Sequence, residues 1–73
     1  MAQLRNQDLL DRVGKQIRKL RKEKGITQED FYNDTNIHIA RIEIGKVNIS
    51  ISVLEAICNY LEINIVDFYK GLS

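Results

Sequence analysis

Basic side chains gather in one stretch of the chain, between Arg12 and Lys24, where Glu23 is the only acid. After position 50 the balance reverses, and acids outnumber bases. Guanidinium and ammonium groups bind phosphate, so the basic stretch indicates contact with a polyanion. A solvated helix face is the plainer alternative, and the net charge of +1 does not decide between them.

Residues that carry catalysis or bind metals are scarce. The chain has one histidine, His38, and one cysteine, Cys58. We find no carboxylate pair, glycine-rich phosphate loop, metal-ligand cluster or activated nucleophile, and therefore expect no enzyme, metal or cofactor. Cys58 falls on an apolar helical stripe, which favours packing. A lone cysteine also excludes an internal disulfide framework, so we expect a cytoplasmic protein.

The length of 73 residues allows one domain with a small core. No apolar run is long enough to cross a membrane, and the first ten residues lack the apolar core of a signal peptide. We expect residues 1–10 to be a flexible N-terminal arm and residues 11–73 to form the domain.

Apolar spacing and capping residues predict an all-α fold. The stripe Val13, Ile17 and Leu20 predicts a first helix that ends at Gly25. Three further helix starts are predicted where a capping residue directly follows an apolar one. The capping residues are Thr27, Ser50 and Asn64. The last two predict helices from about Ile51 and Ile65, the final one ending near Gly71.

The remaining helix is expected over residues 34–43. Ile39 and Ile42 are three residues apart and would face inward, and Gly45 is the expected C-terminal stop. With this segment the chain has five helices.

The chain resembles the Cro/C1-type helix-turn-helix regulators, also called the XRE family. The resemblance spans about residues 13–68 and rests on Ile17-Arg18-Lys19-Leu20-Arg21-Lys22-Glu23-Lys24-Gly25-Ile26-Thr27-Gln28-Glu29-Asp30-Phe31, on Arg41-Ile42-Glu43-Ile44-Gly45-Lys46 and on Asn48-Ile49-Ser50. It implies a compact five-helix, lambda-repressor-like domain whose second and third helices form the helix-turn-helix. It also implies a homodimer on pseudo-palindromic double-stranded DNA, with the third helix in the major groove.

The chain departs from the family in one important respect. Between Gln28 and Arg41 it is shorter by about three residues, nearly one helical turn. If the loss falls in the turn or in early helix 3, the residues that would reach bases are those deleted. We favour a loss within helix 2, because Thr35 would then cap helix 3 and direct Asn36, Ile37 and His38 at the groove. Thr35, at the start of that helix, is also counted among the expected DNA-binding residues.

The resemblance also implies roles for single residues. Gln28 would hold a phosphate at the start of helix 2, and Lys46 and Asn48 would bind the backbone in the loop after helix 3. Arg41 can reach a base or a phosphate. Glu43 is expected to form a structural ion pair with Arg21 that holds helix 1 against helix 3.

These observations favour a sequence-specific DNA-binding transcriptional regulator. A repressor, a controller of a restriction-modification locus and an antitoxin with a toxin partner remain alternatives. A different class also remains open, a protein-interaction module that keeps the fold with reduced base reading. We expect the homodimer surface around helix 5, where Ile63, Ile65, Val66 and Tyr69 exceed what so short a helix can bury.

Overall fold

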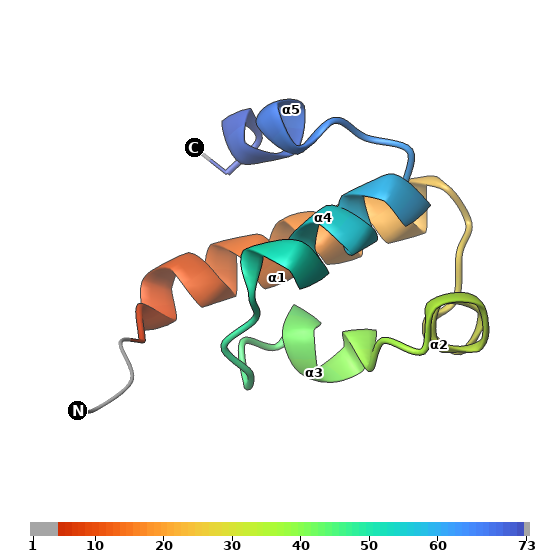
Figure 1. The fold of residues 1–73 in the computed structure, drawn as a ribbon, viewed down its shortest axis with the longest axis horizontal. Coiled ribbons are helices and arrows are strands. Elements are labelled where there is room, and N and C mark those ends of the chain that lie inside the picture. Colours follow the sequence, from red (N-terminus) through yellow and green to blue (C-terminus); the bar gives the residue numbers. More distant parts are fainter. Residues whose placement is uncertain (1–4, 73) are drawn as a thin grey trace.

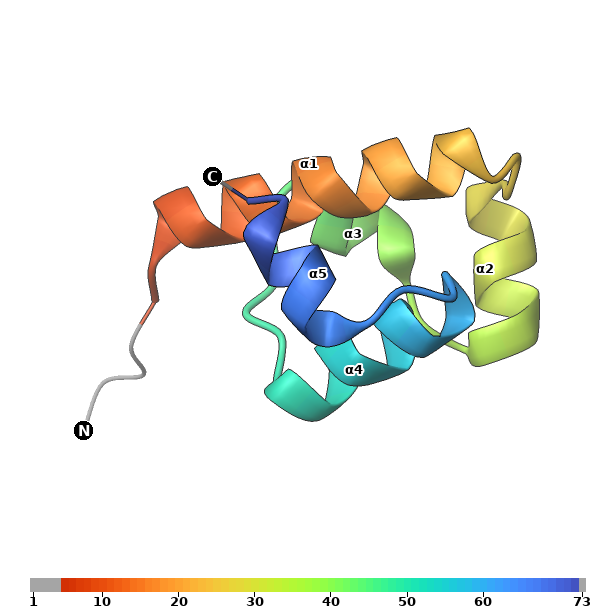
Figure 2. The same ribbon diagram turned by 90° about the horizontal axis from the view of Figure 1, so that it is seen from above.

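The computed structural model describes residues 5–72, which contain five helices and no strand. The helices are α1 (Gln7–Glu23), α2 (Gln28–Thr35), α3 (Ile39–Glu43), α4 (Ile51–Tyr60) and α5 (Ile65–Lys70). In Figure 1, α1 and α4 run across the middle of the domain, with α3 below them and α5 above. The view from above in Figure 2 shows α1 and α4 along opposite edges, with α3 and α5 between them. α2 closes the end at which α1 finishes. The predicted all-α, five-helix fold is confirmed, and no helix in this range is long and apolar enough for a membrane span.

The helix starts follow the predicted caps. Thr27 forms a capping box with Asp30, Ser50 accepts a hydrogen bond from the Val53 amide, and Asn64 accepts one from the Val66 amide. Each side chain thereby satisfies an amide that a helix start leaves without a partner.

The start of α1 differs from the prediction. Asn6 caps this helix and Gln7 begins it, so residues 7–10 are helical and the arm predicted over residues 1–10 is wrong there. Leu10 explains the difference, because its side chain is buried with the inner face of α1 and favours continuing the helix. Residues 1–4 lie outside the described part of the chain.

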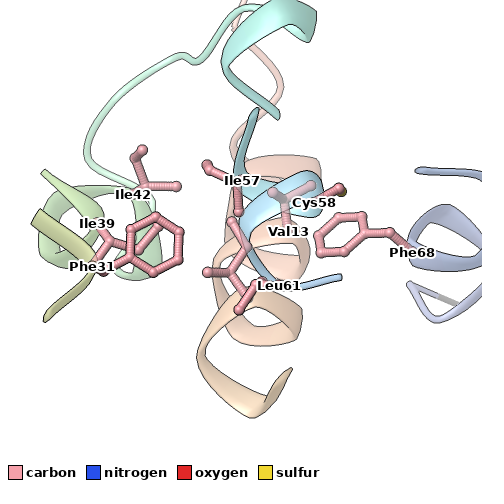
Figure 3. Packing of buried hydrophobic residues seen from close by; sticks show 9 residues of the cluster. Val13, Phe31, Ile39, Ile42, Ile57, Cys58, Leu61 and Phe68 are labelled. Carbon is pink, nitrogen blue, oxygen red and sulfur yellow. The ribbon is translucent and has the colours of Figure 1, made fainter. Parts of the chain in front are cut away.

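The core joins all five helices. Phe31 of α2 and Phe68 of α5 are fully buried at its two ends, and Ile57 and Leu61 lie between them (Figure 3). Cys58 is also buried here, as its position on the apolar stripe predicted, and burial raises the pKa of its thiol. The core thus ties α3, on one side of the domain, to α5 on the other.

The predicted start of the third helix is wrong. α3 begins at Ile39 rather than near Thr35, and His38 precedes it without a side-chain capping bond. Thr35 is the last residue of α2, and its hydroxyl donates back to the Phe31 carbonyl at 2.6 Å. Asn36 then ends α2 with φ of 64°, a left-handed conformation that asparagine tolerates. Residues 36–38 therefore form the whole connection between α2 and α3.

Candidate nucleic-acid interface

α3 lies against α1 at a point where only glycine fits. A Cβ on Gly14 would lie 2.5 Å from the Glu43 carbonyl oxygen and 2.7 Å from that of Ile42. Both neighbours are backbone atoms, which cannot rotate away as a side chain would. The close approach therefore fixes the C-terminal part of α3 relative to α1.

The expected ion pair between Arg21 and Glu43 is present and makes the second connection between these helices. Arg21 donates through Nε to Glu43 Oε2 at 2.6 Å and through Nη2 to Oε1 at 3.1 Å. The side chains are 9% and 2% exposed, so water screens the pair little. Arg21 also donates to the Ile26 carbonyl, which ties the α1–α2 connection to the same pair.

Gln28 joins this network from the start of α2. Its amide nitrogen donates to Glu43 Oε1 at 3.1 Å. The phosphate contact expected of Gln28 would therefore compete with an existing bond through the same nitrogen, while its position at the α2 N-terminus remains exposed. One buried carboxylate thus orients α1, α2 and α3 together.

The outer face of α3 carries the residues that remain open to a partner. Ile39, Ile42 and Glu43 are buried, which leaves Ala40 and Arg41 exposed on the opposite side. Beyond the helix, Gly45 turns the chain with φ of 73°, and the exposed side chains of Lys46 and Asn48 follow it. Arg41, Lys46 and Asn48 are therefore accessible, as their proposed roles require.

The other predicted contact residues lie in the turn between α2 and α3. Thr35 is engaged at the end of α2, where its hydroxyl also accepts a hydrogen bond from the Ile37 amide. Asn36 and His38 are exposed, and the His38 ring lies 4.6 Å from the Tyr32 ring, centroid to centroid. Thr35 does not cap α3, and neither Asn36 nor His38 stands on its first turn, so the reason for expecting Asn36 and His38 to read bases is absent.

Two residues assigned to the arm hold the loop after α3. Arg5 Nη2 and Gln7 Nε2 donate to the Gly45 carbonyl at 2.9 and 3.0 Å, and Gln7 also donates to Asp11. These contacts join residues far apart in the chain, so no local sequence pattern predicts them. They brace the segment that presents Lys46.

Two short helices joined by a turn, α2 and α3, and held by a buried arginine–glutamate pair define a helix-turn-helix protein. The helix-turn-helix family model matches residues 17–68. Because this match covers well over half of the sequence, the chain belongs to the helix-turn-helix family. Its structure is similar to that of the restriction-modification controller protein C.Esp1396I, solved as a tetramer in complex with its natural 35 base-pair operator. The identity is 40%, 88% of each chain is covered, and the TM-score is 0.79.

The wild-type C.Esp1396I structure gives the same 40% identity and TM-score of 0.79, covering 88% of this chain and 86% of that one. No curated protein matches the chain.

Proposed function

We propose that this protein binds operator DNA and regulates transcription, as a controller-type member of its family. The similarity to C.Esp1396I carries the proposal, since that protein was solved on its operator and 88% of both chains is covered. The exposed face of α3 supports it, because Arg41 stands there and Lys46 follows in the next loop. In this arrangement α3 enters the major groove, and residues around it bind the phosphate backbone.

The phosphate contacts come from the loop after α3 and the start of α2. Lys46 and Asn48 provide the first group, and Gln28 provides the second if its amide leaves Glu43. Asn36 and His38 lie in the turn, where they approach the edge of the groove rather than its floor. Base reading then depends mainly on the exposed side chains of α3 itself.

An apolar groove beside α5 supports a homodimer, and Asn48 in the loop after α3 lies at its edge. It has a volume of about 610 Å³ and runs between α1, α4 and α5. Four large exposed apolar side chains line it: Leu9, Ile51, Val66 and Tyr69. Exposed apolar surface of this extent is typical of an interface, and a two-fold axis through it would give two α3 helices on one DNA face. Ile63, also expected at this surface, instead packs against the core.

Sedimentation tests the dimer. Val66→Asp adds a charge to the groove and should shift the protein toward monomer, whereas Asn59→Asp adds the same charge to an exposed α4 position outside the groove lining. An equal effect of both substitutions, or a wild-type protein that is monomeric at high concentration both free and on DNA, would contradict this assignment.

A second candidate is a protein-interaction module that has lost base reading, with a toxin as one possible partner. The five-residue α3 with no side-chain cap favours it. Selection of bound duplexes from random DNA separates the two. Enrichment of one pseudo-palindrome, with half-sites about 10 bp apart or a multiple of that spacing, supports operator binding. Binding without any sequence preference, or no binding, would refute it.

A further inference from the structure

Ile44 is an apolar side chain exposed without an evident structural reason. It is 60% exposed at the C-cap of α3. Of the six large apolar side chains exposed in residues 5–72, four line the groove and Tyr32 lies against the His38 ring, which leaves Ile44. Single exposed apolar residues are common, so its position relative to the other elements must decide whether it has a role.

The position of Ile44 is on the outer face of α3. Ala40 and Ile44 are four residues apart and Arg41 and Ile44 three apart, spacings that put side chains on one helix face. The backbone of Ile44 is close to helical, with φ of −99° and ψ of 8°, so this spacing still holds at the cap. Ala40, Arg41 and Ile44 therefore form one small surface, here called the α3 outer face.

The C-terminal end of α3, where Ile44 stands, is held on both sides. Glu43, the neighbour of Ile44, is bonded to Arg21, and its carbonyl lies against Gly14. On the other side, the Gly45 carbonyl receives bonds from Arg5 and Gln7. The backbone between two such fixed residues has little positional freedom, so Ile44 is presented from a fixed position, which suits it for shape-dependent contact.

We propose that Ile44, together with Ala40, recognises a thymine of the operator by packing against the C5-methyl group of that base. The inference rests on the proposed function, because it requires α3 to lie in the major groove. Thymine is the only base that presents a methyl group there, and apolar side chains are its partners. Arg41 on the same face would supply the charged contact to a neighbouring guanine or phosphate, so the surface combines one apolar and one basic reader.

Deoxyuridine tests the proposal, because it differs from thymidine only in lacking this methyl group. The probe is the duplex that the wild-type protein selects from random DNA, with each thymine of a half-site replaced in turn by uracil. Loss of the contact at one position should weaken wild-type binding about fourfold, the equivalent of one buried methyl group. Ile44→Ala should reduce the difference between the thymine and uracil duplexes at that position to the part that Ala40 supplies. Ile44→Val, which keeps a branched apolar end, should retain most of the difference.

Folding does not obscure the result, since Ile44 is exposed and its variants should unfold at the wild-type temperature. If no uracil substitution couples to Ile44→Ala while one sequence is still selected, this inference is overturned and the proposed function stands. If no sequence is selected from random DNA, both are overturned.

Discussion

Glu43→Ala is expected to destabilise the domain strongly, because it leaves the buried guanidinium of Arg21 without its carboxylate partner. Arg21 would keep the Ile26 carbonyl as its remaining hydrogen-bond acceptor among residues 5–72. Breaking a buried ion pair by removing one partner costs about 3 to 5 kcal/mol. A domain of 73 residues has a total stability of roughly 4 to 11 kcal/mol, so the variant should be partly unfolded at the lower end of that range.

The interaction itself is measured by a double-mutant cycle. Arg21→Ala leaves the Glu43 carboxylate bonded to Gln28 and should also be destabilising. The double variant should lose less than the sum of the single losses, because neither charge then remains unpaired. Free energies of unfolding come from urea denaturation followed by circular dichroism. Where an alanine variant does not fold, Glu43→Gln keeps the side-chain volume and an acceptor for Arg21, and should lose less.

The control pair is Arg12 and Asp8, which are also bonded through their side chains but are 53% and 70% exposed. Water screens this pair, so its cycle should show no resolvable coupling. Losses at Arg21 and Glu43 that add within about 0.5 kcal/mol would refute the argument that the buried pair holds the fold.

Three further substitutions test other contacts. Gly14→Ala should lower the free energy of unfolding by about 1 to 3 kcal/mol in thermal unfolding, because the added Cβ meets the α3 backbone. This is the opposite of the usual effect of alanine in a helix. A neutral result would mean that α3 is not held so closely. The hydrogen bond to Asp34 raises the pKa of Tyr60 to about 12, so the stability from this bond is present below about pH 10 and is lost as the pH rises through 12. Asp34→Asn should return that pKa toward its ordinary value in an ultraviolet titration, and an unchanged curve would contradict the assignment. Lys46→Ala should weaken binding to every DNA sequence alike and reduce the salt slope by about one unit. Lys19→Ala is the matched control: Lys19 belongs to the basic stretch of residues 12–24, but it lies about 140° around α1 from Gly14, which faces α3. Equal effects of the two substitutions would show that Lys46 makes no contact beyond that of a general positive charge.

The helix starts could be predicted because each depends on neighbouring residues. At Thr27, Ser50 and Asn64, the capping side chain accepts a hydrogen bond from an amide no more than three residues later. The local sequence therefore contains the whole interaction. The pair of Arg21 and Glu43 is different. Nothing in the spacing of these two residues indicates that they meet, and the expectation came from resemblance to the family.

The contacts of the first residues could not be predicted for a related reason. Arg5 and Gln7 are about 40 residues before Gly45 in the chain, yet both donate to its carbonyl. A backbone carbonyl that accepts such bonds leaves no pattern in the sequence. Polar residues before an amphipathic helix look the same whether they brace a loop or lie free in solvent.

Thr35 shows why the boundary of α3 was misplaced. A threonine after an aspartate can begin a helix, but it can equally end one by donating to the carbonyl four residues before it, as the Thr35 hydroxyl does to Phe31. Local sequence gives both choices, and packing decides between them. Gly14 and Arg21 hold the C-terminal end of α3 against α1, and Ile39 must reach the core. With that end fixed, α3 begins only at Ile39, and its exposed residues are Ala40 and Arg41, with Ile44 exposed at its C-cap.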